Sequence, residues 1–139
     1  MCHFCRMFIF AEMVAQMERG EEIRIERKKV LSWAKENLVG KSIPEHQTGK
    51  TIQFTVKGVK ELVNQPHKYY QEKLEMILNL MEEYPNSIFV GESLDERRED
   101  YCYRYYRTVI AGEDSYFVVR ENRITGLVDM YSIVDKIKE

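Results

Sequence analysis

The C-terminal third of the chain sets the strongest limit on the fold. Residues 101–133 contain three runs rich in Tyr, Phe, Val and Ile. Short polar turns at Gly112-Glu113 and at Glu121-Asn122-Arg123 separate these runs, which is the pattern of hairpins. The predicted strands are Tyr101–Ala111, Asp114–Arg120 and Leu127–Ile133. Three consecutive strands joined by tight turns form an antiparallel meander, and such a sheet can leave one face open to solvent and ligand.

Helical spacing of apolar residues dominates the first part of the chain. A stripe from Phe10 to Met17 predicts a helix that ends at Gly20, because glycine readily adopts a left-handed C-cap. Glu21–Leu38 continues with the same period and predicts a second helix, for which Gly40 is the natural stop.

The middle of the chain alternates between strand and helix patterns. Thr51–Lys57 alternates apolar and polar residues and predicts a half-buried strand, which Gly58 breaks. Val59–Val63 fits a short helix that closes before Pro66. His67–Tyr84 predicts the clearest amphipathic helix of the chain. The remaining segments are predicted as a loop, a short strand and an exposed loop, at Lys41–Gly49, Ser87–Val90 and Gly91–Asp100.

These elements predict an α+β domain in which N-terminal helices pack on one face of a roughly four-stranded antiparallel sheet. The length of 139 residues fits one such domain, with 44% apolar and 32% charged residues. No apolar run is long enough to span a bilayer, and the first twenty residues do not resemble a secretory signal. We therefore expect a soluble cytoplasmic protein.

The charge and cysteine content narrow the functions. A net charge of −2 gives no global attraction for nucleic acid, so any polyanion site must be a local cluster of Lys and Arg. Cys2-His3-Phe4-Cys5 places three soft ligands close together, but a structural zinc site needs four, and Cys102 stands alone. We therefore predict no metal and no cofactor.

Four short stretches together resemble a known family. They are Trp33-Ala34-Lys35-Glu36-Asn37 with Gly40-Lys41, Ile52–Lys60, Asn64-Gln65-Pro66-His67-Lys68 and Tyr131-Ser132-Ile133-Val134-Asp135. Their order resembles large polyvalent-protein-associated domains of phages and mobile elements, related to the barnase, EndoU, colicin-tRNase and RelE-like (BECR) nuclease fold. The resemblance covers roughly Lys29–Ile137. We therefore expect a BECR-like domain at residues 29–139 and a helical extension at residues 1–28.

The resemblance implies RNA cleavage without a metal, in which the ribose 2′-OH attacks the adjacent phosphate. The catalytic residues vary widely within this nuclease group, and some members are thought to be inactive. Cleavage of this kind needs a proton donor or acceptor of near-neutral pKa, a fixed positive charge and a flat group that holds a base.

His67 is the best candidate for the acid–base group. It is predicted to open a helix, where free N–H groups attract phosphate and the dipole lowers the pKa of a histidine. Lys57, Lys60 and Lys68 bracket the same turn and are candidates for phosphate contacts. The alternatives are a surface histidine packed on Pro66 and ordinary solvated lysines.

The hairpin strands supply the positive charge and the aromatic rings. Arg104, Arg107 and Arg120 lie among tyrosines, and an arginine between strand aromatics can clamp a phosphate while Tyr105 stacks a base. The alternative is a set of cross-strand Arg–Tyr pairs on a solvated face. Ser132 in the last strand can hold a phosphate oxygen or simply bond to backbone.

Two functions follow. The first is a toxin-like, metal-independent endoribonuclease with His67, Lys60, Lys68, Arg120 and Ser132 as catalytic residues, and Lys57, Tyr105 and Arg107 as RNA contacts. The second is a catalytically inactive RNA- or protein-binding module on the same fold. The acidic net charge favours the second, and His67 with the arginine-bearing strands favours the first.

The expected partners are tRNA or mRNA, or a protein such as a neutralising antitoxin. The apolar N-terminal stripe either completes the core or forms a surface for a homodimer or another partner.

Overall fold

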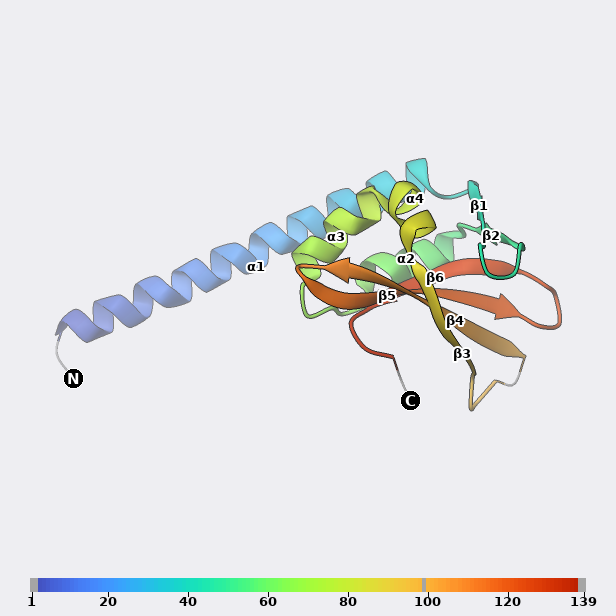
Figure 1. The fold of residues 1–139 in the computed structure, drawn as a ribbon. Coiled ribbons are helices and arrows are strands. Elements are labelled where there is room, and N and C mark those ends of the chain that lie inside the picture. The colour runs from blue at the N-terminus through green and yellow to red at the C-terminus, as the bar shows by residue number, and fades with distance from the viewer. Residues whose placement is uncertain (1–2, 99, 138–139) are drawn as a thin grey trace.

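The computed structural model describes residues 3–98 and 100–137, with side chains from residue 19 onward. It confirms the α+β class (Figure 1). The helices are α1 (His3–Asn37), α2 (Val56–Asn64), α3 (Tyr70–Leu78) and α4 (Leu80–Glu83), followed by a 3-10 turn at Tyr84–Asn86. The strands are β1 (Ser42–Pro44), β2 (Thr51–Gln53), β3 (Ile88–Leu94), β4 (Tyr101–Ile110), β5 (Glu113–Asn122) and β6 (Val128–Val134).

The N-terminal region is one helix, so the prediction of a break at Gly20 is wrong. Gly20 lies inside α1, because a single glycine costs only about 1 kcal/mol in a helix and does not end it alone. The C-terminal end of α1 packs on the body through Val30 and Ala34, with Leu38 just after the helix, and the rest of α1 extends away from the body (Figure 1). Gly40 follows with φ +87, as its predicted role as a stop requires. The side chains of the Phe10–Met17 stripe lie outside the described residues.

The sheet is larger than predicted and is not purely antiparallel. Its strand order is β1-β2-β6-β5-β4-β3. The four strands β3 to β6 form the predicted antiparallel meander, whereas β2 pairs with β6 in parallel and β1 pairs with β2. The predicted loop at residues 41–49 therefore contains β1. A strand of three residues carries too little alternation to be recognised in a sequence.

The two hairpin turns differ in how closely they match the prediction. The β4–β5 turn consists of Ala111 and Gly112, with φ of 53° and 79°, as the favoured two-residue hairpin turn requires. It lies one residue earlier than predicted. The β5–β6 turn lies later than predicted, because β5 continues through Asn122 and β6 begins only at Val128. The Asn122 side chain accepts hydrogen bonds from the backbone N–H groups of Ile124 and Thr125 in this turn.

The strand predicted for residues 51–57 ends early, because a helix begins inside it. The Thr55 hydroxyl accepts a hydrogen bond of 3.0 Å from the Gly58 N–H and so caps α2. Gly58 lies inside this helix. A Cβ at this position would lie 2.7 Å from the backbone oxygen of Met130, so the glycine allows α2 to pack closely against β6.

The long helix predicted for residues 67–84 is split in two. Asn79 leaves the helical conformation with φ −113° and ψ 17°, and its side-chain amide donates to the backbone oxygen of Glu75. Such a local bond competes with the helix and separates α3 from α4. After the 3-10 turn, β3 extends to Leu94, well into the predicted loop.

The helices cover one face of the sheet, and no described helix covers the opposite face (Figure 1). The core between the layers contains, among others, Ile52, Phe54, Val59, Leu62, Leu74, Ile77, Tyr84, Tyr106, Phe117, Val119, Met130 and Ile133. Among the described residues, no helix is both long and apolar enough to cross a membrane.

Candidate functional site

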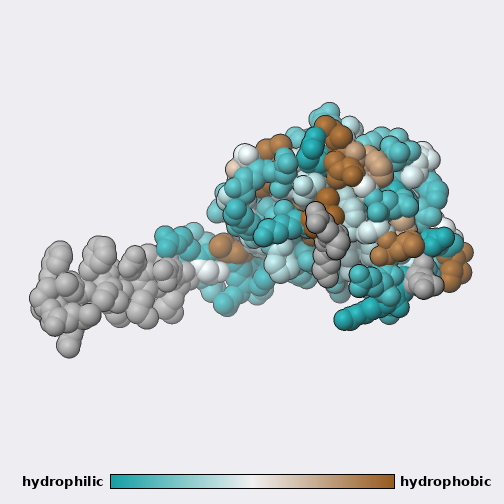
Figure 2. All heavy atoms as spheres, turned by 60° about the horizontal axis from the view of Figure 1, so that its bottom comes forward, coloured by the Kyte–Doolittle hydropathy of each residue, from teal (hydrophilic) through white to brown (hydrophobic). Residues whose placement is uncertain are grey.

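The uncovered face of the sheet carries a group of tyrosines and arginines, which we call the tyrosine face. Alternation along β4 places every second residue on this side, and the register with β5 and the bulge in β6 add the others. Its members are Tyr101, Tyr103, Tyr105, Arg107, Tyr116, Arg120 and Tyr131. The five tyrosines are half-buried, so each ring is held on the sheet but remains partly accessible. Figure 2 brings the lower side of Figure 1 forward and shows polar residues with separate apolar patches among them.

Arg120 lies at the centre of the tyrosine face. Its guanidinium carbon lies 4.4 Å from the centroid of the Tyr131 ring and 5.0 Å from that of Tyr101. Its Nη2 also forms an ion pair of 3.0 Å with the buried carboxylate of Asp129. Burial opposes the charge of Arg120, but the hydrogen bond from Arg120 to Asp129 outweighs burial and raises the pKa of the guanidinium. Arg120 is therefore a fixed cation that orders two aromatic rings.

Two of the tyrosine hydroxyl groups are engaged at the sheet surface. The Tyr103 hydroxyl donates a hydrogen bond of 3.0 Å to Asp95, and the Tyr105 hydroxyl lies 2.8 Å from the Ser93 hydroxyl. Burial and the carboxylate of Asp95 raise the pKa of Tyr103 far above neutrality. The Tyr103 hydroxyl therefore stays protonated at neutral pH, and the rings of Tyr103 and Tyr105 remain the accessible feature.

Charge on the tyrosine face is local and limited. Arg107 is exposed and lies opposite Tyr116 in the β4–β5 register. Arg98 lies at the end of the face, with its guanidinium carbon 5.8 Å from the centroid of the Tyr101 ring. Ser132, the predicted phosphate contact, lies next to Val118 in the register and is buried.

His67 lies in the turn between α2 and α3, three residues before α3 begins. Its Nδ1 accepts a hydrogen bond of 2.8 Å from the backbone N–H of Tyr69, so the neutral ring carries its proton on Nε2. Nε2 lies 2.9 Å from the hydroxyl of the buried Ser115, which is therefore the acceptor. The pKa of His67 is lowered, as expected, but burial and not a helix dipole is the principal cause.

The predicted lysines do not gather around one pocket with His67. Lys68 forms an ion pair of 3.1 Å with Glu113, and its backbone N–H donates to Asp135. Lys57 and Lys60 are exposed on α2. A lysine that was not predicted, Lys73 of α3, is instead completely buried near His67, with its ammonium bonded to the backbone oxygen of Gln65.

The structure thus separates the predicted site residues into two places. Arg120, Arg107, Tyr105 and Ser132 lie on the uncovered side of the sheet. His67 bonds to Ser115, which alternates with the core residues of β5 and so faces the helices. His67 and Arg120 therefore lie on opposite sides of the sheet and do not converge on one phosphate. Their catalytic roles stay a prediction.

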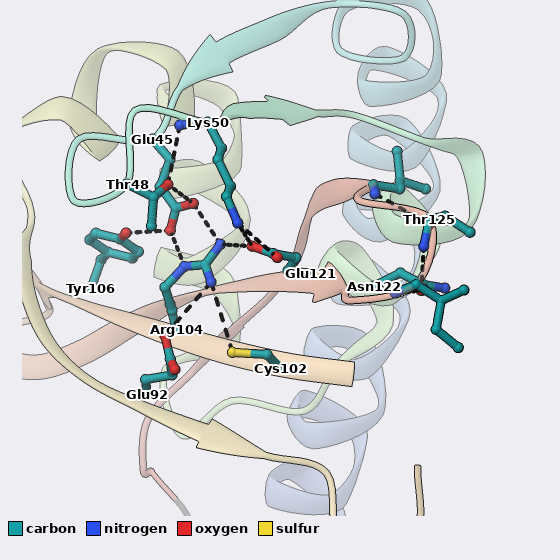
Figure 3. A network of polar contacts seen from close by, with 12 residues as sticks. Glu45, Thr48, Lys50, Glu92, Cys102, Arg104, Tyr106, Glu121, Asn122 and Thr125 are labelled. Atoms are coloured by element: carbon teal, nitrogen blue, oxygen red, sulfur yellow. Dashed lines mark hydrogen bonds and ion pairs between the residues drawn. The ribbon is translucent and has the colours of Figure 1, made fainter. Parts of the chain in front are cut away.

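A buried ionic network is the largest feature that the sequence did not predict. Arg104 of β4 points toward the helices, where its Nε lies 2.6 Å from Glu45 and its Nη2 lies 2.7 Å from Glu121 (Figure 3). Tyr106 and Thr48 donate further hydrogen bonds to Glu45. Burial opposes the charge of Glu45, but the hydrogen bonds from Arg104, Thr48 and Tyr106 outweigh burial and lower the pKa of Glu45. The network ties the β1–β2 turn to the sheet.

The sequence held no clear signal for this network. Glu45 is charged and lies in the segment predicted as a loop, yet the structure buries it completely. Glu45 is fully engaged with protein groups, and Arg104 is 4% exposed. The network is therefore a structural tie, and the arginine predicted as a candidate phosphate clamp is already occupied.

The hollow between the helices and the β4–β5 turn lies apart from the tyrosine face. A hollow of about 350 Å³ lies between the helices and the β4–β5 turn, and its lining includes Glu72, Glu75 and Glu83, which repel phosphate. Within the residues that the structure describes, no group of three or more His, Cys, Asp or Glu can hold a metal ion. The Cys2–Cys5 cluster lies outside the residues whose side chains are described.

The fold and the uncovered tyrosine face define a small α+β domain with an open sheet surface. The sequence matches the family described as Large polyvalent protein-associated domain 3 (LPD3) over residues 21–123, and the chain belongs to this family. No curated protein and no solved structure matches the chain significantly.

Proposed function

We propose that this LPD3 domain is a non-catalytic module that binds single-stranded RNA on its tyrosine face. The observation that carries the proposal is the position of Arg120, held between the rings of Tyr101 and Tyr131 on a sheet face without a helical layer. Ordered aromatic rings beside arginine are the usual platform for unpaired bases.

The energetics favour stacking over charge. Each base that stacks on an aromatic ring contributes about 1–3 kcal/mol, and hydroxyl contacts already hold Tyr103 and Tyr105 in place. By contrast, Arg120 is neutralised by Asp129, and the whole chain has a net charge of −2. We therefore expect binding that depends only weakly on salt, with a slope corresponding to about one or two phosphate contacts.

The tyrosine face lacks a group suited to acid–base catalysis near pH 7 among its described residues. The raised pKa values of Tyr103 and Tyr131 make them poor bases, and Asp129 is committed to Arg120. This composition supports binding without cleavage.

The test is the affinity of the whole chain for a labelled single-stranded RNA, measured by fluorescence anisotropy. Tyr131→Ala should weaken binding by about tenfold or more, because it removes one stacking ring and one side of the Arg120 stack. Tyr131→Phe keeps the ring and should bind almost as well as the wild type. Arg107→Ala should weaken binding and make the salt slope shallower by about one.

The matched control is Arg24→Ala. Arg24 is exposed on α1 and forms only a 3.4 Å pair with Glu21, so its removal should leave RNA affinity unchanged. Equal affinity of Tyr131→Ala and the wild type would refute the proposal. An equal loss with Arg24→Ala would indicate nonspecific binding and refute the assigned surface.

A second candidate is the metal-independent ribonuclease that the BECR resemblance implies. One observation favours it: two groups suited to proton transfer near neutrality lie close together at the α2–α3 turn. Burial lowers the pKa of His67, and burial lowers the pKa of Lys73 to about 7. Such a site would lie at this turn and not on the tyrosine face.

The cleavage assay separates the two candidates. Total tRNA and an RNA oligomer are incubated in EDTA with the wild type, His67→Ala and Arg120→Ala. Cleavage that leaves a 2′,3′-cyclic phosphate and disappears with His67→Ala supports the ribonuclease. RNA binding without cleavage supports the binding module.

A further inference from the structure

We propose that the free edge of β3 is a strand-addition site for an extended segment of a partner protein, with a Lys or Arg opposite Glu92. This site is distinct from the tyrosine face and does not depend on RNA binding. It would allow the domain to hold a second polypeptide while its sheet face remains open.

The two edges of the sheet differ in a way that points to β3. The edge strand β1 has three residues and includes Pro44, which lacks a backbone donor. The other edge strand, β3, has seven residues and no proline, lysine or arginine. Natural proteins usually protect an edge with such residues, because its free N–H and C=O groups can pair with another chain. An extended strand can pair with such a row of groups through main-chain hydrogen bonds.

The side chains of β3 fit a partly apolar strand. Ile88, Val90 and Leu94 are 54%, 40% and 54% exposed. The only charged residue of β3 is Glu92, whose side chain is 53% exposed and lies 3.7 Å from Arg104 at the rim of the buried network. Charge complementarity therefore selects a basic residue at the opposing position.

A second copy of this chain fits the edge poorly. An antiparallel pair of β3 strands centred on Glu92 would bring two glutamates directly opposite each other. A pair centred on Gly91 would join Phe89, which packs on the core, to Ser93, which bonds to Tyr105 on the uncovered side. The irregularity between Phe89 and Gly91 causes this mismatch of faces. The occupant is therefore a different segment.

The experiment uses the whole chain and a labelled octapeptide of alternating Val and Thr with one central Arg. Binding is measured by anisotropy, and hydrogen exchange reports protection of the β3 amides. We expect binding with slower exchange in β3. Glu92→Lys should weaken binding at least fivefold, and a peptide with Glu in place of Arg should recover it.

The matched peptide control carries N-methyl groups on alternate residues, which removes the donors of one strand edge and keeps the side chains. Loss of binding with this peptide supports strand addition. Equal binding of the methylated peptide, failure of the charge swap, or unchanged exchange in β3 would overturn the proposal. A dimer that buries β3 in the free protein would also overturn it, since the occupant would then be a second copy.

Discussion

Two buried cations in this domain have opposite surroundings. Arg104 is 4% exposed and lies within 2.8 Å of the carboxylates of Glu45 and Glu121. Lys73 is completely buried, yet its ammonium bonds to the backbone oxygen of Gln65 and otherwise lies over the ring of Tyr70. The same fold therefore pairs one buried cation with carboxylates and leaves the other with a neutral backbone oxygen and an aromatic ring.

The acid–base equilibria of the two groups follow from this difference. Burial opposes the charge of Arg104, but the hydrogen bonds to Glu45 and Glu121 outweigh burial and raise its pKa. Burial lowers the pKa of Lys73 to about 7, since the charges of Asp135 and Glu61 offset burial only in part. A buried cation therefore stays charged where it hydrogen-bonds directly to carboxylates. It is much more easily deprotonated where its hydrogen-bond partner is only a backbone carbonyl.

The largest effect is expected from breaking the Arg104 network. Glu45→Gln removes the buried carboxylate and should lower the free energy of unfolding by about 3 kcal/mol, because Arg104 is left with one buried partner. Urea denaturation at pH 7 measures this change. The matched control is Glu92→Gln, whose half-exposed carboxylate lies 3.7 Å from Arg104 and should contribute less than about 0.5 kcal/mol. Equal losses in the two variants would contradict this account.

The opposite sign is expected at Lys73. A pKa of about 7 in place of 10.5 corresponds to a charging penalty of up to about 5 kcal/mol. Lys73→Met removes this penalty but also the bond to Gln65, so the variant should be more stable at pH 7 by about 2 kcal/mol.

The pH dependence sharpens the test of Lys73. Between pH 7 and 10.5 the unfolded chain binds a proton at this lysine that the folded chain does not bind. The stability of the wild type should therefore rise with pH across this window, whereas Lys73→Met should lack this rise. Lys60→Met, at an exposed position of α2, is the control and should keep the wild-type pH profile. A less stable Lys73→Met at pH 7 would show that Lys73 is better paired than its surroundings indicate.

A smaller effect is expected at His67, which shares the environment of Lys73. Burial lowers its pKa, so its contribution to stability is present above about pH 6.5 and is lost as the pH falls through the folded value. His67→Gln should cost about 1 kcal/mol at pH 7 and flatten the stability profile below pH 6.5. Denaturation between pH 5 and 8 measures this, together with NMR titration of the ring. A ring that titrates at or above pH 6.5 would contradict the buried neutral state.

The smallest effect is expected at the rim of the Arg104 network. Lys50 is 50% exposed and pairs with Glu121 at 2.8 Å. Lys50→Ala should cost less than about 1 kcal/mol, and the cost should shrink in high salt. Denaturation of the wild type and of Lys50→Ala in 50 mM and 500 mM NaCl measures this cost and its salt dependence. A large loss that does not depend on salt would place Lys50 inside the network and not at its rim.

The sequence predicted the parts of the fold whose patterns are long. The alternation in residues 101–133 extends over many positions, so the meander and the tyrosine face could be predicted. The short strand β1 could not, because three residues give almost no periodic signal, whereas β2 lies within the predicted strand Thr51–Lys57 and only ends earlier. Glu45 was missed for the same reason. Asn79 divides a helix whose apolar pattern continues through this position. The sequence pattern alone does not reveal that its side chain bonds to the backbone of Glu75 and interrupts the helix.

The candidate site could be predicted only in part. Residues two apart in a strand share a face, so Tyr105 and Arg107 were correctly placed together. Whether His67 lies near Arg120 depends on how the α2–α3 turn packs against the sheet. No sequence spacing determines that packing, and the turn lies on the helical side.

The parallel pair of β2 and β6 has a consequence for synthesis on the ribosome. β6 lies between β2 and β5, so the last strand to be translated occupies an interior position of the sheet. Until residue 134 leaves the exit tunnel, β2 lacks its partner β6, and the edge of β5 that pairs with β6 stays unpaired. The nascent domain therefore cannot close its sheet stepwise from the N-terminus, and its folding must follow the emergence of β6.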